Sequence, residues 1–103
     1  LEAGFIPQML VDFSDANSSK RHQKQIDVGK DVAGQIARGN RRIMGVMLES
    51  NLVAGRQDWR DDQELIYGQS ITDACISWDD SVPLLNELAE AVRKRREAPI
   101  EID

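Results

Sequence analysis

The sequence predicts an α/β fold, and three features of the chain support this prediction. Apolar runs at residues 9–13 and 43–48 are typical of buried strands. Residues 22–38, between them, repeat apolar side chains at spacings typical of an amphipathic helix. A second helical pattern follows near the end of the chain. The order strand, helix, strand, helix is that of βαβ units, so we expect parallel strands joined by a right-handed crossover.

The first predicted helix and the strand after it have clear signals. Gly39 and Asn40 supply the usual stop at the end of a helix. The strand at 43–48 is apolar at every position except Gly45, which is typical of a strand covered on both faces. The apolar positions of the helix are Ile26, Val28, Val32, Ala33, Ile36 and Ala37.

Beyond the second strand the chain is polar and irregular, and residues 65–67 are the one further strand expected there, as an arm of a hairpin. A second helix is then predicted, with Asp80 or Ser81 as its cap and Pro83 in its first turn. The basic run at 93–96 is interpreted as a solvated end that complements the helix dipole. The apolar stripe of this helix consists of Val82, Leu85, Leu88, Ala89 and Val92.

The predicted strands are too few for a complete fold. A chain of 103 residues forms one domain at most, yet parallel strands that are apolar on both faces need neighbouring strands. We therefore predict that residues 1–103 are the last two β/α units of a TIM (β/α)₈ barrel, a fold of typically about 250 residues. An open doubly wound sheet is the alternative. An incomplete barrel exposes an apolar strand edge, so we expect a homo-oligomer of this chain.

The charge balance excludes some partners. With 13 Lys and Arg against 18 Asp and Glu, the net charge is −5. This field repels phosphate backbones and anionic lipids, so neither nucleic acid nor a membrane is an expected partner. No apolar run approaches the roughly 18 residues of a membrane span, and the N-terminus lacks the pattern of a secretion signal. The single cysteine, Cys75, allows no internal disulfide, which fits a reducing cytoplasm.

Carboxylates stand where both predicted strands end. Asp15 follows the first strand and Glu49 ends the second. In α/β folds the functional face lies at the carboxyl ends of the strands, so these two side chains should lie on one rim. Asp73, after the irregular segment, can return to the same rim as a third oxygen ligand for Mg²⁺ or Mn²⁺. Chance proximity is the alternative, because 18 residues of the chain are acidic.

Other chemically capable residues have simpler explanations. His22 begins a helix in polar surroundings and is interpreted as a solvated residue rather than a ligand or base. Cys75, between two apolar residues, is interpreted as a small buried hydrophobe. Lys20 and Arg21 precede the predicted helix, where solvent is at least as good a partner as a phosphate.

Four blocks of the sequence carry a resemblance to a known family. They read VDFSDANSSK, GVMLESNLVAG, YGQSITDACISWDD and AVRKRR. In order and spacing these blocks, over about residues 9–96, resemble the C-terminal part of type I 3-deoxy-D-arabino-heptulosonate-7-phosphate (DAHP) synthase. That family folds as a (β/α)₈ barrel, so the resemblance implies that this chain spans the seventh and eighth β/α units.

The resemblance also implies an activity and a metal site. The family condenses phosphoenolpyruvate with erythrose 4-phosphate, the first step of the shikimate pathway, and uses a divalent metal such as Mn, Mg or Fe as a Lewis acid. The metal is held by a cysteine, a histidine, a glutamate and an aspartate. The glutamate falls on Glu49 and the aspartate on Asp73, which is also expected to contact substrate.

The histidine of the family block DFSHANS falls on Asp15, and there this sequence departs from the pattern. Aspartate is shorter than histidine and brings a negative charge, which favours hard cations and weakens their pull on an aldehyde oxygen. The resemblance places the cysteine ligand and a phosphate-binding Lys-Pro-Arg-Thr loop outside this chain. We therefore expect a weakened metal site and no turnover by the isolated chain.

Three functional hypotheses remain open. The first is a portion of a metal-dependent DAHP synthase with Glu49, Asp73 and Asp15 as ligands. The second is a non-catalytic fragment or paralogue that persists as an assembly module after loss of the ligand histidine. The third, a sister enzyme that acts on another aldose phosphate, is disfavoured by the block SITDACISW.

Overall fold

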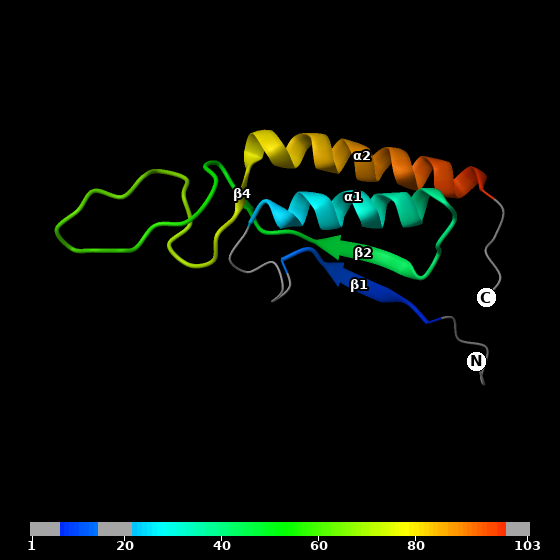
Figure 1. Ribbon diagram of the computed structural model, residues 1–103, viewed down its shortest axis with the longest axis horizontal. Helices are drawn as coiled ribbons and strands as arrows, with labels where there is room; N and C mark the ends of the chain where they lie inside the picture. The colour runs from blue at the N-terminus through cyan, green and yellow to red at the C-terminus, as the bar shows by residue number, and fades with distance from the viewer. Residues whose placement is uncertain (1–6, 15–21, 99–103) are drawn as a thin grey trace.

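The computed structural model describes residues 7–14 and 22–98, which form two helices lying along a small parallel sheet (Figure 1). No helix in this part of the chain combines the length and the apolar character that crossing a bilayer requires. In chain order the elements are β1 (Met9–Asp12), α1 (Lys24–Ala37), β2 (Ile43–Met47), β3 (Ser50–Asn51), β4 (Ile76–Ser77) and α2 (Trp78–Glu97).

The strands β1 and β2 are parallel neighbours, which confirms the predicted βαβ arrangement. In their register Leu10 pairs with Gly45, and Asp12 pairs with Met47. The ladder continues past the strand ends, since the N–H of Phe13 donates to the carbonyl of Met47 over 2.8 Å. Because the two strands run in the same direction, their carboxyl ends meet at one edge of the sheet.

Both helices pack on the same face of the β1–β2 sheet. Phe13, just past β1, is 1% exposed and has the largest side chain among the fully buried residues. The helices approach closely, because a Cβ added at Gly29 of α1 would lie 2.7 Å from a methyl carbon of Leu84 in α2. The buried core consists of Phe13, Val32, Ala33, Ile36, Ile43, Ile76, Leu84, Leu88 and Ala91.

The end of α1 has the geometry that its sequence predicts. Gly39 has a φ of 106°, in the left-handed region that glycine adopts without steric cost. Its N–H donates to the carbonyl of Ile36 over 3.0 Å, and the N–H of Asn40 donates to the carbonyl of Gln35 over 3.2 Å. These two bonds are those of a Schellman motif, so the predicted helix stop is confirmed.

The helix α2 begins earlier than predicted. Its cap is Ser77, whose hydroxyl accepts a hydrogen bond from the N–H of Asp80 over 3.1 Å, so the prediction of Asp80 or Ser81 as the cap is wrong. Pro83 therefore lies inside the helix, beyond its first turn. Ser81 is buried, and its hydroxyl donates to the carbonyl of Ser77 over 2.7 Å. Because a hydroxyl has one proton, Ser81 accepts from the hydroxyl of Ser50, 2.5 Å away.

The buried face of α2 is rotated from the predicted stripe. Leu88 is buried and Val92 packs against the core as expected, but Val82, Leu85 and Ala89 are exposed. The helix has two adjacent apolar stripes, and the described residues cover only the one that faces α1 and the strands. The buried positions are Ser81, Leu84, Leu88 and Ala91.

The basic end of α2 is not wholly solvated, contrary to expectation. The guanidinium Nη1 of Arg95 donates to the carbonyls of Asn40 and Ile43, over 3.1 and 2.9 Å. Arg93 instead forms a surface ion pair with Glu90, with 2.9 Å between nitrogen and oxygen. Arg95 therefore ties the last turn of α2 to the start of β2.

Residues 52–74 leave the body of the molecule as a long loop, which we call the excursion (Figure 1). The predicted strand at 65–67 is wrong, because these residues form open loop and turn. The two limbs of the excursion are joined here by the side chain of Gln57 rather than by strand pairing. The side-chain amide of Gln57 donates to the carbonyls of Ile66 and Gln69, both over 2.9 Å, and its oxygen accepts from the N–H of Ile66.

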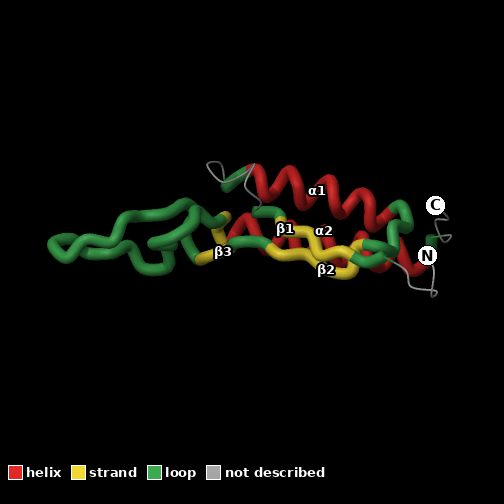
Figure 2. The backbone as a smooth tube through the Cα atoms, turned by 90° about the horizontal axis from the view of Figure 1, so that it is seen from below, coloured by secondary structure: helices red, strands yellow, loops and turns green. Residues whose placement is uncertain are grey.

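The second face of the β1–β2 sheet has no cover among the described residues. Leu10, Met44 and Met47 on this face are 63, 65 and 47% exposed. The molecule is elongated (Figure 2), and its radius of gyration of 16.8 Å exceeds the roughly 13 Å of a compact domain of this length. The expected shortage of neighbouring strands is thereby confirmed for the described part of the chain.

Candidate metal centre

The edge where β1 and β2 end is rich in carboxylates. Asp12 is the last residue of β1, and Glu49 follows β2 by two positions. The excursion leaves the body and returns to it at this same end of the sheet (Figure 1). Asp15, the third predicted ligand on this rim, lies outside the described residues.

Glu49 is fixed by its backbone at the junction of the two small sheets. Its carbonyl accepts from the N–H of Ile76, over 3.0 Å, which brings the start of β4 beside it. The side chain of Gln25, in the first turn of α1, bonds both the N–H and the carbonyl of Glu49. The Glu49 peptide is therefore held from two sides while its carboxylate remains partly exposed.

The returning limb of the excursion brings Asp73 to the same place. Cys75 and Gly55 exchange two backbone hydrogen bonds, over 2.9 and 3.1 Å, which close the base of the excursion. The Nε of Arg56 donates to the carbonyl of Thr72 over 2.8 Å, next to Asp73. These bonds position an exposed aspartate beside Glu49 although the two residues lie 24 positions apart in the chain.

The nearby Asp73 affects the pKa of Glu49. Burial raises its pKa, and the Asp73 carboxylate raises it further both by charge repulsion and by accepting a hydrogen bond from the protonated form. The charge of Asp12 acts in the same direction, whereas a hydrogen bond from Ser14 opposes it. The net direction is upward, as expected for a carboxylate that is partly buried and lies among like charges.

Asp12 and Ser14 form a second polar pair at this edge. The N–H and the hydroxyl of Ser14 both donate to Oδ1 of Asp12, over 2.8 and 2.5 Å, and these bonds lower the pKa of Asp12. A single hydroxyl proton serves one acceptor at a time. Ser14 therefore cannot donate its hydroxyl proton to Asp12 and Glu49 at the same time.

Cys75 is buried as the sequence predicts. Its thiol donates to the carbonyl of Asp73 over 3.5 Å, so the sulfur helps to fix the turn before β4. Burial raises the pKa of the thiol, and the charge of Glu49 raises it as well. A thiol that is held protonated in this way is a packing residue rather than a nucleophile or metal ligand.

The described residues bring two carboxylates together at this edge. Glu49 and Asp73 offer hard oxygen donors at one point, which suits Mg²⁺ or Mn²⁺. Within residues 7–14 and 22–98 no group of three His, Cys, Asp or Glu side chains is arranged to hold an ion. The pair fits a divalent cation only if further ligands come from Asp15 or from outside this chain.

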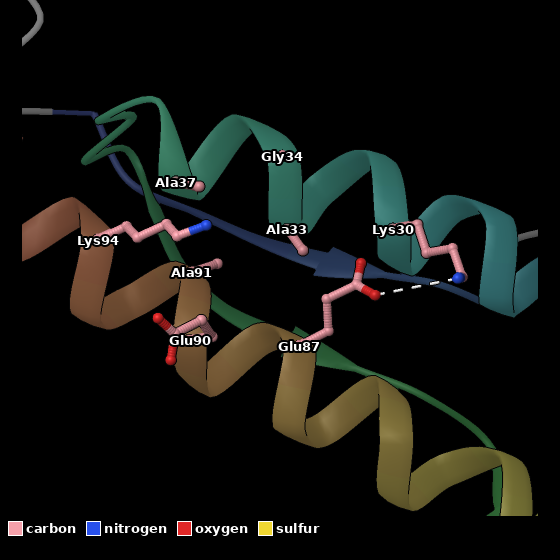
Figure 3. A pocket seen from close by; sticks show the side chains of 8 residues that line it. All are labelled: Lys30, Ala33, Gly34, Ala37, Glu87, Glu90, Ala91 and Lys94. Carbon is pink, nitrogen blue, oxygen red and sulfur yellow. Dashed lines mark ion pairs between the residues drawn. The ribbon is translucent and has the colours of Figure 1, made fainter.

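Other candidates do not add to this site. His22 is partly exposed and lies two positions before α1. Lys20 and Arg21 lie outside the described residues. The groove between the two helices, where Lys30 and Glu87 form an ion pair at 3.9 Å, measures about 220 Å³ (Figure 3). Ligand pockets begin at roughly 300 Å³ and are mostly apolar, so this charged surface groove is a weak candidate.

Sequence reasoning missed three residues that shape the site, namely Asp12, Ser14 and Gln25. An acidic residue inside an apolar run, followed two positions later by serine, is the signature of the local hydrogen bonds that Asp12 and Ser14 form. Gln25 lies four residues before Gly29 and seven before Val32, so it shares the buried face of α1. Gln25 could have been noticed in the sequence because it is a polar residue on the apolar face of the predicted helix.

The fold and the rim together define an α/β protein with paired carboxylates at the strand ends. A model of the DAHP synthetase I family matches residues 1–86. The phospho-2-dehydro-3-deoxyheptonate aldolase of Haemophilus influenzae is 58% identical over 97 residues, and the Phe-sensitive enzyme of that name from Escherichia coli is 54% identical over 95. The chain belongs to the DAHP synthetase I family, so the resemblance and the assignment to an enzyme family are confirmed.

The matches cover most of this chain but a small part of the relatives. They span 94% of the chain and 27% of the H. influenzae protein, and 92% and 27% in the E. coli comparison. A solved structure of the aldolase from Francisella tularensis superposes with a TM-score of 0.79 at 48% identity, over 86% of this chain and 26% of that one. The chain therefore spans about a quarter of the length of these relatives.

Proposed function

We propose that this chain is the C-terminal portion of a metal-dependent DAHP synthase of the cytoplasm. The whole enzyme condenses phosphoenolpyruvate with erythrose 4-phosphate at the start of aromatic amino acid biosynthesis. The observation that carries the proposal is the pairing of Glu49 with Asp73 at the strand ends in a chain of this family. Neither residue gains from the other electrostatically, which is expected of groups kept for a ligand rather than for stability.

The (β/α)₈ barrel is the second part of the proposal. The uncovered face that contains Leu10, Met44 and Met47 is apolar, and a barrel interior would cover it. The stripe of Val82, Leu85 and Ala89 on α2 would likewise pack on elements outside this chain. The remaining length of the relatives, about three quarters, is ample for the other six β/α units.

In the complete enzyme Glu49 and Asp73 would hold the divalent cation, which supplies Lewis-acid polarisation of the sugar aldehyde. Both carboxylates must be ionised to bind it, and the ion would remove the repulsion that raises the pKa of Glu49. Asp73 is exposed at the rim, so it would also be the residue that meets substrate. Asp15 would take the third place, with the cysteine ligand coming from the rest of the barrel.

A binding experiment tests the metal site directly. Mn²⁺ is titrated into the 103-residue chain and into its Asp15→His variant by calorimetry. Histidine adds a neutral ligand of longer reach, so the variant should bind more tightly than the parent chain. If neither protein binds Mn²⁺, this chain alone has no metal site, and the proposal loses its main chemical argument.

Catalysis is tested in a hybrid that joins this chain to the upstream three quarters of the H. influenzae relative. With Asp15→His the hybrid should consume phosphoenolpyruvate in the presence of erythrose 4-phosphate and Mn²⁺. With Asp15 it should be slower by at least about 100-fold, because ligand geometry is lost. Equal rates in the two hybrids would show that position 15 is not a ligand.

A non-catalytic assembly module is the second candidate function, and one observation favours it. The open apolar face around Met44 and Met47 is suited to pair with another copy of the chain. Sedimentation of the isolated chain tests this, with a homo-oligomer as the expected result. A monomer that binds Mn²⁺ would leave the enzyme fragment as the better account.

A further inference from the structure

Gln25 is one of two fully buried polar side chains in the described part of the molecule, with 1% of its surface exposed. Its Nε2 donates to the carbonyl of Glu49 over 3.0 Å, and its Oε1 accepts from the N–H of Glu49 over 2.8 Å. One side-chain amide thus bonds both polar groups of a single residue that lies 24 positions away.

This bonding pattern makes Gln25 a substitute for a neighbouring strand. A strand partner offers a carbonyl and an N–H at about the same spacing, and the side-chain amide of glutamine offers the same pair of groups. At Glu49 the β2 ladder has already ended, and the paired segment β3 begins only at Ser50. Gln25 therefore fixes the peptide of Glu49 in the short gap between β2 and β3, which residues 48 and 49 span.

Burial makes the arrangement rigid. The side chain of Gln25 is buried, so a conformation that breaks its hydrogen bonds to Glu49 would leave polar atoms unpaired and is disfavoured. The Glu49 carbonyl also accepts from the N–H of Ile76, over 3.0 Å, at the start of β4. The position of Glu49 is thereby coupled both to α1 and to the limb that carries Asp73.

We propose that Gln25 is a positioning residue for the metal centre, which aims the Glu49 carboxylate at Asp73 by holding the Glu49 peptide. The inference rests on the proposed function, because it assigns Gln25 to the ligand pair of that site. Partners that orient a metal ligand change metal affinity by about 10-fold to 100-fold when they are removed, and we expect an effect of that size here.

The test uses the 103-residue chain with Asp15→His and two further substitutions made separately. Gln25→Met keeps the volume and the helix propensity but removes both hydrogen bonds to Glu49. Gln35→Met is the matched control, because Gln35 lies on the same helix and its side-chain amide donates to Asp31 of that helix, over 3.3 Å. Mn²⁺ affinity is measured from the electron paramagnetic resonance of the free ion, at a temperature where all proteins are folded.

Loss of stability alone must be separated from loss of position. A third variant, Val32→Ala, weakens the core without touching Glu49, and its affinity shows what destabilisation does by itself. Exchange of the Glu49 amide proton, followed by NMR, reports the hydrogen bond to Gln25 without any metal. We expect Gln25→Met to lower Mn²⁺ affinity 10-fold to 100-fold and to speed this exchange, while Gln35→Met and Val32→Ala retain the parent affinity.

Each departure from this result has one meaning. Unchanged Mn²⁺ affinity in Gln25→Met, in a parent that binds, overturns the positioning role and leaves the proposed function intact. Equal losses in Gln25→Met and Val32→Ala also overturn it, because the effect is then one of stability. No Mn²⁺ binding by the parent is a failure of the proposed function, and the inference falls with it even if the amide exchange changes.

Discussion

The body of the molecule and the excursion are held together by different forces. The body has a buried apolar core that includes Phe13 and Leu84, with exposed fractions of 1 and 3%. In the excursion, residues 52–74, no residue is buried, and Ile66 and Tyr67 are 55 and 88% exposed. Side-chain hydrogen bonds from Gln57 replace a core there. The acid pair joins the two regions, so its geometry depends on the weaker one as well as the stronger.

The largest effect should come from the core of the body. Phe13→Ala removes the largest fully buried side chain, at the point where β1 meets both helices. Large-to-small changes of this kind cost about 3–5 kcal/mol, which can exceed the stability of an incomplete domain. We expect the variant to be unfolded or nearly so by circular dichroism in water, with urea unfolding of the parent chain as the reference.

The matching change in the excursion should do little. Ile66→Ala also removes an apolar side chain, but one that is 55% exposed. The free energy of unfolding from urea titration should therefore change by less than about 0.5 kcal/mol. If Ile66→Ala destabilised the chain as much as Phe13→Ala, the excursion would be packed in solution against something that the described residues do not include.

Gln57→Ala should have a smaller and more local effect than Phe13→Ala. This change removes the three hydrogen bonds by which the Gln57 side chain joins the two limbs of the excursion. Each is worth about 1 kcal/mol, and the loss should be local because no core residue is touched. We expect limited proteolysis to cut within residues 58–66 several times faster, while the urea midpoint of the body changes little.

Gln63→Ala serves as the control, since Gln63 lies at the exposed tip of the same excursion. It should leave the cleavage rate near that of the parent. A fall in the global urea midpoint of Gln57→Ala would instead mean that the excursion and the body unfold as one unit.

Gly39→Ala should cost about 1 kcal/mol, less than a core change and similar to one hydrogen bond. The residue closes α1 with a φ of 106°, where an alanine Cβ is strained. Thermal unfolding measures the loss. Gly34→Ala, inside the same helix, is the comparison and should be neutral or stabilising, because alanine has the higher helix propensity.

The body was predictable from local patterns, and the excursion was not. Both long strands and α1 follow from apolar periodicity, and the end of α1 follows from Gly39, because these signals lie within a few residues of the structure they cause. The short strand β4 carries no such signal, and the missed cap at Ser77 follows from missing it. In the excursion the structure depends on Gln57 and Gln69 bonding distant carbonyls, which no local pattern indicates.

The residues of the candidate site also differ in how far the sequence could predict their positions. Glu49 could be placed on the rim from strand direction alone, since the carboxyl ends of parallel strands meet at one edge. Asp73 was expected there, but the bonds that return it, between Cys75 and Gly55, could not be derived from spacing. Asp15 is the position to which the resemblance assigns a family histidine, and both that assignment and its place on the rim stay predictions.

A substitution at Glu49 is the most direct probe of the place where the body and the excursion meet. Glu49→Gln should stabilise the chain at pH 7.5. A raised pKa means that the folded state disfavours the ionised carboxylate, so the charge of Glu49 opposes folding. The gain should be below about 1 kcal/mol, since the carboxylate is partly exposed and solvent screens its repulsion. It is measured as the difference in urea midpoint between variant and parent.

The pH dependence gives the sign. Above its raised pKa in the fold, Glu49 is ionised in both folded and unfolded chains, so the advantage of Glu49→Gln is then complete. It should shrink as the pH falls through that value and vanish below the ordinary pKa of a glutamate, where Glu49 is protonated in both states. A loss of stability in Glu49→Gln at pH 7.5 would mean that a cation or donor already compensates this carboxylate, and that Asp73 is not the group it meets.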